Sequence, residues 1–237
     1  MVNVVTICER VLVRLSKMDY ERKGGCSEER LIFPNTFPSE SRIKKGISEK
    51  QFLEFSRISE QELRFLFVDE FLKDSNNGYY SVETPTENKY RFGKTNEDIK
   101  IDSSGRSASI DMCVFEKSND NSKYKRKLNI EFKNENATGK SISKDILKLV
   151  HEKENGVFVL LLKNTDNGTL KKVLDKFSAS FDSHKEKWRG EKNKFIQLII
   201  LSLEAETNKN KTAFLKYRKV LKKDLVTIKS NIGDEWI

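Results

Sequence analysis

Two acidic residues and a lysine carry the clearest chemical signal in the sequence: Asp111, Glu131 and Lys133. Each lies in a segment where apolar and polar residues alternate, as they do in a half-buried β-strand. Glu131 and Lys133 are two residues apart, so their side chains leave a strand on the same face. Paired carboxylates offer hard oxygen ligands to Mg²⁺ or Mn²⁺, and a neighbouring lysine can stabilise negative charge on a phosphate.

The two segments predict a hairpin, with strands over 107–115 and 127–133 and turn residues over 118–122. Centring the loop on residue 121 pairs Met112 with Ile130 and Asp111 with Glu131. Both apolar sets then share one face, and the acids share the other. The alternation favours registers with an even index sum, and a slip within that set stays open.

The elements that must position these residues follow from periodicity. We expect helices at the N-terminus and over 59–72, 143–154 and 170–187. Continuous apolar runs over 157–162 and 195–203 are typical of strands buried on both faces. Two short strands are also expected, Tyr79 to Glu83 and Lys89 to Phe92, around the turn at Pro85. This order predicts an α/β fold, a mixed sheet of about five strands flanked by helices.

Taken together, these residues resemble the PD-(D/E)xK nuclease superfamily, which has the restriction-endonuclease-like fold. The resemblance rests on Asp111, the hairpin, Glu131-Phe132-Lys133, and the helix and buried strand that follow. It covers roughly Ser59 to Leu203. The stretches Gly105-Arg-Ser-Ala-Ser-Ile-Asp111 and Lys144-Asp-Ile-Leu-Lys-Leu149 look like an uncharacterised bacterial branch of that superfamily. The proline of the family's motif is Ile110 here.

The resemblance implies that Asp111 and Glu131 hold the metal, joined by the main-chain carbonyl of Phe132, and that Lys133 acts in catalysis. A glutamate on the preceding helix often completes such a site. Glu62 is the candidate, with Glu60 and Glu70 as rivals.

Each of these residues also has a plainer interpretation. Glu131 and Lys133 could form a solvated strand face, and Ser59 with Glu62 fits a capping box. Glu83 could approach the site, but a structural role is favoured. Arg106 and Lys144 are candidate substrate contacts, or ordinary solvated residues.

The composition favours a polyanionic partner. The chain has 237 residues and a formal net charge of +9. We expect DNA as the partner, with RNA and a homodimer left open. Three scattered cysteines and only two histidines argue against a disulfide framework, a zinc site or a histidine-based nuclease. The absence of an apolar run of roughly 18 residues argues against membrane binding, and we expect a cytoplasmic protein.

Two regions are predicted, an N-terminal helical and irregular extension (1–57) packed on a nuclease domain (58–237). The domain ends in a basic segment over 211–229 that we expect to be helical. Gly93-Lys94-Thr95 and Gly139-Lys140-Ser141 lack the glycine that a phosphate-binding loop needs five residues earlier. The leading hypothesis is a Mg²⁺-dependent nuclease. The alternative is a non-catalytic nucleic-acid-binding or protein-interaction module on the same fold.

Overall fold

The structure of the chain, a computed structural model, describes residues 2–22, 30–31, 59–74, 78–93, 99–118, 123–135, 137–207 and 210–237. Most of the predicted N-terminal extension after residue 22 lies outside these ranges, and so does most of the turn expected over 118–122. The irregular part of that extension therefore stays a prediction.

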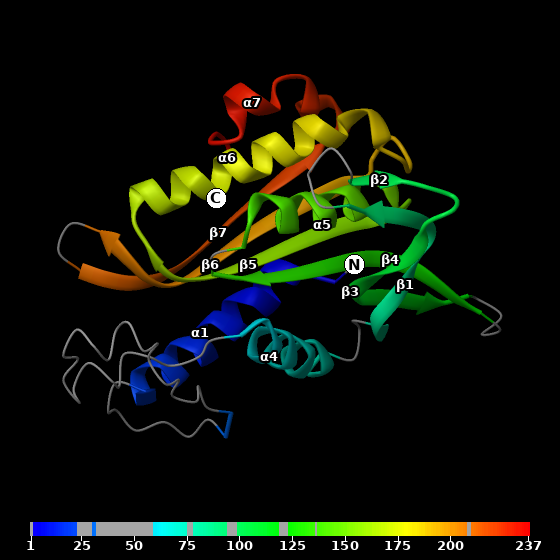
Figure 1. Ribbon diagram of the computed structural model, residues 1–237. Coiled ribbons are helices and arrows are strands. Elements are labelled where there is room, and N and C mark those ends of the chain that lie inside the picture. The colour runs from blue at the N-terminus through cyan, green and yellow to red at the C-terminus, as the bar shows by residue number, and fades with distance from the viewer. Residues whose placement is uncertain are drawn as a thin grey trace, which may run out of the picture.

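Within the described residues, seven strands form one mixed sheet (Figure 1). The strand order is β2-β1-β3-β4-β5-β6-β7. The strands are β1 Tyr79–Phe92, β2 Ile99–Ile101, β3 Arg106–Lys117, β4 Tyr124–Asn134, β5 Asn155–Thr165, β6 Phe195–Thr207 and β7 Asn210–Leu221. Strands β4, β5 and β6 run parallel, and the other neighbours are antiparallel. The parallel strands are joined by the crossover helices α5 (Gly139–His151) and α6 (Asn167–His184).

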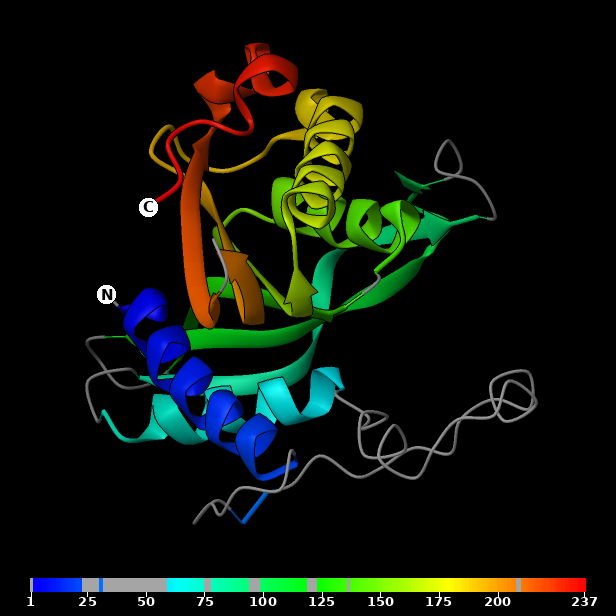
Figure 2. The ribbon, with the colours of Figure 1, turned by 90° about the vertical axis from the view of Figure 1, so that its left-hand side faces the viewer.

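Helices cover both faces of the sheet (Figure 2). One face carries α1 (Val4–Arg22) and α4 (Glu60–Leu72). The other carries α5, α6 and the short α7 (Ile228–Asn231). The side chains of β5 alternate between the two resulting cores: Val159 packs on the α1 side, and Phe158 and Leu160 pack on the α5 side. The continuous apolar run over 157–162 is therefore a strand buried on both faces, as predicted.

The N-terminal helix belongs to the main core. Ile7, Val11 and Leu15 of α1 are buried in one cluster with Phe67 of α4 and Phe132 of β4. Helix α4 begins with the predicted capping box: the Glu62 carboxylate accepts a hydrogen bond from the Ser59 N–H at 2.9 Å. This cap fixes where α4 starts, and so which of its side chains face the sheet.

The basic C-terminal helix predicted over 211–229 is wrong. Residues up to Leu221 form β7, an edge strand antiparallel to β6, followed by a 3-10 helix (Lys222–Val226) and α7. Leu215 and Tyr217 pack against the core on the α1 side, and Val220 packs in the core on the α5 side. A strand with apolar residues on both faces can imitate the spacing of an amphipathic helix, and backbone pairing with β6 decides the outcome.

The count of about five strands is also corrected to seven within the described residues. The two short strands expected around Pro85 form one strand, β1, with an irregular register between Pro85 and Lys89. Strand β2 has three residues, too few for any periodic signal.

No helix in the described part of the chain combines the length and the apolar character needed to cross a membrane.

Candidate active site

Next to Asp111 the β3–β4 hairpin has the predicted register, whereas nearer the turn the register shifts by one residue, between Val114 and Phe115. Met112 lies opposite Ile130, and Val114 lies opposite Leu128. Among the described residues, Met112–Ile130 is the last pair at this end, whereas β4 continues beside β5 as far as Asn134. The two hairpin strands therefore separate next to Asp111 and Glu131.

Asp111 fills the opening between the strands and connects two elements. Its Oδ1 accepts a hydrogen bond from Nη2 of Arg64 on α4 at 2.8 Å. Its Oδ2 accepts one from the backbone N–H of Phe132 on β4, also at 2.8 Å. The Asp111 side chain is 12% exposed. The carboxylate thus takes the place of a strand partner for Phe132, at a point that solvent can still reach.

Glu131 is fully buried and faces α5. Its Oε1 lies 2.6 Å from Nζ of Lys148. Among the described residues, its Oε2 has no hydrogen-bond donor. Burial, then the charge of Asp145, raises the pKa of the Glu131 carboxyl well above its ordinary value, although Lys148 opposes this. The charge of Asp111 also raises the pKa of Glu131, so the two acids interact electrostatically. A buried carboxylate oxygen without a donor is costly, and such an atom calls for an explanation.

Lys133 lies near Glu131, and its ammonium group contacts three oxygen acceptors. Its Nζ lies 3.0 Å from Oδ2 of Asp145 and donates to the carbonyl of Phe132 at 3.0 Å. It also lies 3.5 Å from Oε2 of Glu60. Burial alone would lower the pKa of Lys133, but Asp145, Glu60 and Asp111 together raise it above the ordinary lysine value. Lys133 is therefore a persistent cation and cannot serve as a base at neutral pH.

Three charged residues of this cluster were missed in the sequence: Arg64, Asp145 and Lys148. They lie on the helices that cover the separated strands, Arg64 on α4 and the other two on α5. Lys148 bridges Glu131 and Asp145, at 2.6 and 2.8 Å, and donates to the carbonyl of Ser109 at 2.9 Å. A signal for Lys148 existed, because it interrupts the apolar run from Ile146 to Val150 and so must be buried or paired.

The outer edge of the cluster is acidic. Glu60 on α4 lies 3.5 Å from Arg64 Nη2, and Glu83 on β1 accepts a hydrogen bond from Arg64 Nη1 at 2.6 Å. The Glu83 side chain is 57% exposed, and its φ of 48° is uncommon for a residue other than glycine. Burial raises the pKa of Glu60, and Lys133 partly opposes this shift. Glu83 contacts Arg64, and Arg64 in turn donates a hydrogen bond to Asp111.

The charges of the cluster do not cancel. It contains five carboxylates and three cations. If all ionise, two negative charges are in excess, and Glu131 Oε2 has no donor. Both features fit a divalent cation. Among the described residues, no three His, Cys, Asp or Glu side chains form a ligand cluster. A cation here would use Asp111, Glu131 and the Phe132 carbonyl, with the remaining positions filled by water, as Mg²⁺ commonly does.

The three candidate glutamates of α4 have different partners in the structure. Glu62 is engaged with Ser59 at the helix start. Glu70, near the other end, is 2.9 Å from Arg10 Nε and 3.1 Å from Arg14 Nη1, both on α1. Glu60 contacts Lys133. Of the three, Glu60 is therefore the acid that lies at the candidate site.

The two proposed substrate contacts lie outside the cluster. Arg106 is exposed at the start of β3. Lys144, on α5, has its Nζ 5.3 Å from the centre of the Phe92 ring. Neither forms an ion pair with the acids in the described part of the chain. Their role in substrate binding stays a prediction.

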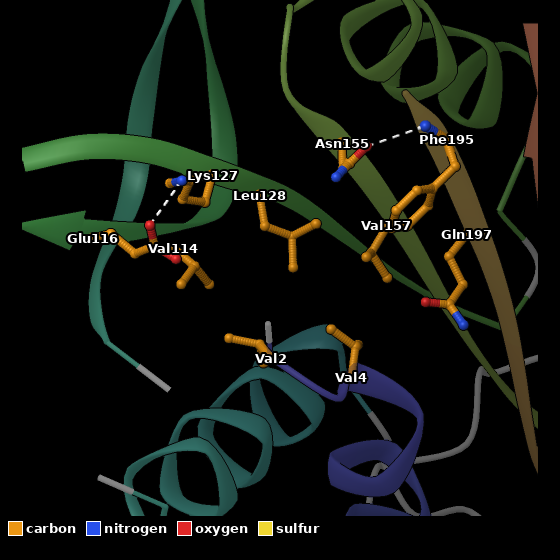
Figure 3. Close-up of a pocket in the computed structure, with 10 residues that line it drawn as sticks. All are labelled: Val2, Val4, Val114, Glu116, Lys127, Leu128, Asn155, Val157, Phe195 and Gln197. Carbon is orange, nitrogen blue, oxygen red and sulfur yellow. Dashed lines mark hydrogen bonds and ion pairs between the residues drawn. The ribbon is translucent and has the colours of Figure 1, made fainter. Parts of the chain in front are cut away.

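An apolar hollow of about 410 Å³ lies elsewhere, between the start of α1 and the sheet (Figure 3). Val2 and Val4 line one side, and Leu128 and Val157 line the other. Its charged residues, Glu116 and Lys127, pair with each other at 2.7 Å. None of the acids of the cluster around Asp111 lines this hollow, so it is not the candidate active site.

No protein-family model matches the chain, and neither a curated protein nor a solved structure matches it. The case for a function therefore rests on the geometry of this cluster.

Proposed function

We propose that the chain is a divalent-metal-dependent nuclease with a restriction-endonuclease-like core. The observation that carries the proposal is the opening between β3 and β4. There a buried glutamate with an unpaired oxygen, an aspartate bound to the β4 backbone and a persistent lysine cation come together. The matching hairpin register and the crossover helix α5 support the fold assignment.

Asp111, Glu131 and the main-chain carbonyl of Phe132 are the proposed metal ligands. A Mg²⁺ or Mn²⁺ ion bound there would supply positive charge to a phosphate oxygen and acidify water. Lys148 already neutralises one oxygen of Glu131, at 2.6 Å, and so limits the cost of burying this acid. Arg64 does the same for Asp111. Both cations hold the acids in place in the absence of a metal.

Lys133 and Glu60 are the side chains proposed to take part in the reaction besides the metal ligands. Lys133 stays protonated, so it can donate a hydrogen bond to a phosphate oxygen and stabilise negative charge that develops there. The pKa of Glu60 is raised, and its side chain is 27% exposed. Such a carboxylate can accept a proton from water more readily than an ordinary glutamate.

The proposed substrate is nucleic acid, with DNA favoured by the resemblance to DNA-cutting enzymes. A net charge of +9 suits a polyanionic substrate. The cluster itself recognises a phosphodiester and not a base or a sugar, so RNA stays open. The expectations of a cytoplasmic protein and of a homodimer stay predictions.

The direct test is digestion of plasmid DNA, linear duplex, single-stranded DNA and single-stranded RNA with Mg²⁺, Mn²⁺ or a chelator. We expect cleavage of at least one substrate, dependent on the metal. Asp111→Asn should abolish it, because this change removes a charged metal ligand while keeping the shape of the side chain.

The matched control is Glu116→Gln, an acid-to-amide change on the same strand at an exposed position. It should cut as fast as the wild type. A wild type that cuts none of the four substrates with either metal contradicts the proposal. Cleavage that survives Asp111→Asn contradicts the assignment of the site.

One observation favours a second function, a non-catalytic interaction module on the same fold. Each buried acid already has a cation partner, Arg64 for Asp111 and Lys148 for Glu131, so the cluster could be purely structural. On this account divalent metals should neither bind nor change the melting temperature, whereas a metal that binds only the folded state must raise it.

A further inference from the structure

A second polar site lies at the other end of β4. A hollow of about 650 Å³ opens there, between the first residues of β4, the end of α5 and the loop before β6. Its lining includes six lysine or arginine residues and two glutamates. The cations are Lys125, Arg126, Lys127, Lys153, Arg189 and Lys194. Such a surplus of positive charge around one hollow focuses an attractive field for anions.

Half of these cations already have an acidic partner. Lys127 pairs with Glu116 at 2.7 Å, on the side of the neighbouring apolar hollow (Figure 3). Lys153 lies 3.3 Å from Glu87, and Arg126 lies 3.3 Å from the buried Glu152. Lys125, Arg189 and Lys194 line the hollow and form no ion pair within the described residues, so no carboxylate in direct contact compensates their charge. Nη1 of Arg189 donates to Oδ1 of Asn88 at 2.9 Å.

Lys194 is the most informative of the three because it is buried, at 2% exposure. Its Nζ donates to the carbonyls of Val150 and Glu152 and lies 5.2 Å from the centre of the Trp188 ring. The pKa of Lys194 is lowered to about 7, mainly by burial; Glu154 and Glu152 oppose this shift, and Arg189 adds to it. Glu154 and Glu152 are near enough to favour the ammonium form, but no carboxylate of the described residues contacts Lys194 directly, as one does for most buried cations.

The plain alternative is that Lys194 only caps a helix. The two carbonyls are at the C-terminal end of α5, where a lysine is favourable. A helix end carries about half a negative charge, so it can balance only part of an ammonium group. The cap explains where Lys194 points, but it leaves net positive charge beside Arg189 and Lys125.

We propose that this hollow binds a phosphate-bearing anion, with Lys194 at its floor and Arg189 and Lys125 at its rim. The site shares no residue with the candidate active site. Lys127, at the hollow, and Glu131 are four residues apart on β4, about 13 Å along a strand. The proposal holds whether or not the chain cuts nucleic acid. The anion could come from a small phosphorylated molecule or from the backbone of a nucleic acid.

The test is calorimetric titration of the full chain with inorganic pyrophosphate at constant ionic strength, alongside a chloride titration. We expect saturable binding of pyrophosphate only. Emission of Trp188 should change with the same midpoint, since its ring lies next to Lys194. Competition by a nucleoside diphosphate and by a short oligothymidine identifies the source, because the better competitor carries the natural phosphate.

Lys194→Met should weaken pyrophosphate binding about tenfold or more, the usual effect of losing one charged hydrogen-bond donor. Because a buried position can compromise folding, the exposed pair Lys125→Met with Arg189→Gln is a second variant with the same expected loss. Lys171→Met, exposed on α6 and outside the hollow, is the matched control and should bind like the wild type. Absence of saturable binding to the wild type overturns the proposal. So does unchanged affinity in the rim variant.

Discussion

Two glutamates, Glu131 and Glu152, are both completely buried, yet their surroundings differ in kind. Glu152 is surrounded by donors: the N–H of Glu87 at 2.9 Å, the amide of Asn88 at 3.2 Å, the hydroxyl of Tyr90 at 2.9 Å and Arg126 at 3.3 Å. Both of its oxygens are satisfied. Glu131 has one lysine partner at 2.6 Å, and its second oxygen has no donor among the described residues.

The difference in hydrogen-bond donors indicates different roles for the two glutamates. Donors from β1 and β4 converge on Glu152 and tie the irregular middle of β1 to the end of α5, which is a structural task. Around Glu131 the other acids, Asp145 and Asp111, raise its pKa. Acids gathered around a carboxylate with an unsatisfied oxygen fit the proposed metal site better than a purely structural role.

The largest expected effect concerns Lys133. If the region of Glu131 is built for chemistry, Lys133→Met should slow metal-dependent cleavage by about 10²–10³, the usual cost of losing one preorganised charge at a transition state. Metal binding should persist. The rate constant is measured in single-turnover cleavage of the best substrate.

Lys123→Met, at an exposed position before β4, is the control for the loss of a lysine and should cut normally. A Lys133→Met protein that cuts as fast as the wild type would make Lys133 an ordinary ion-pair partner of Asp145.

The same substitution at both glutamates tests the comparison itself. Glu152→Gln places an amide N–H₂ against existing donors and should lower the free energy of unfolding by about 2–3 kcal/mol. Glu131→Gln removes a desolvated charge and leaves Lys148 paired with Asp145, so it should change the free energy of unfolding by less than about 1 kcal/mol without metal. Urea denaturation of the two variants at neutral pH measures both values. Equal losses would mean that Glu131 is as structural as Glu152.

The pH dependence of stability also tests the role of Glu131, once the contribution of His184 is taken into account. Burial lowers the pKa of His184 to about 4, where its Nε2 contacts Ser143 Oγ at 2.8 Å. The folded state therefore disfavours protonation, and stability present above pH 6.5 is lost as the pH falls towards 4. The lowered pKa of His184 corresponds to a loss of about 3 kcal/mol.

Glu131 acts in the opposite direction. Its raised pKa contributes stability below its ordinary value of 4.5, and this contribution is lost as the pH rises. His184→Gln should remove the part of the acid-side loss that comes from His184, while His151 and Lys194, whose pKa values are also lowered, contribute equally in both backgrounds. Adding Glu131→Gln should then make stability rise more steeply with pH, because the opposing contribution of Glu131 disappears. A slope that is unchanged by the second substitution would show that the Glu131 carboxyl titrates normally.

Features with a local cause could be predicted from the sequence. Alternation on both sides of one turn gave the register that pairs Met112 with Ile130, and Ser59 with Glu62 gave the start of α4. Features that depend on contacts between different elements could not be predicted. The strand β7 was mistaken for a helix because only pairing with β6 distinguishes the two.

The partners of the acids were missed for the same reason. Arg64 reaches Asp111, 47 residues away, only because the fold brings α4 next to the end of the β3–β4 pairing. The donors that satisfy Glu152 come mainly from residues 87–90, more than 60 positions earlier. No spacing rule within one element can anticipate contacts between residues so far apart in sequence.

The most direct test of the account is Mn²⁺ binding, followed by the loss of the electron paramagnetic resonance signal of the free ion. The wild type should bind at least one Mn²⁺ ion per chain, with competition by Mg²⁺. Asp111→Asn and Glu131→Gln should each lose this ion while remaining folded, and Glu152→Gln should keep it. If the wild type binds no Mn²⁺, or if the Asp111 and Glu131 variants bind it as tightly as the wild type, the opening between β3 and β4 is not a metal site.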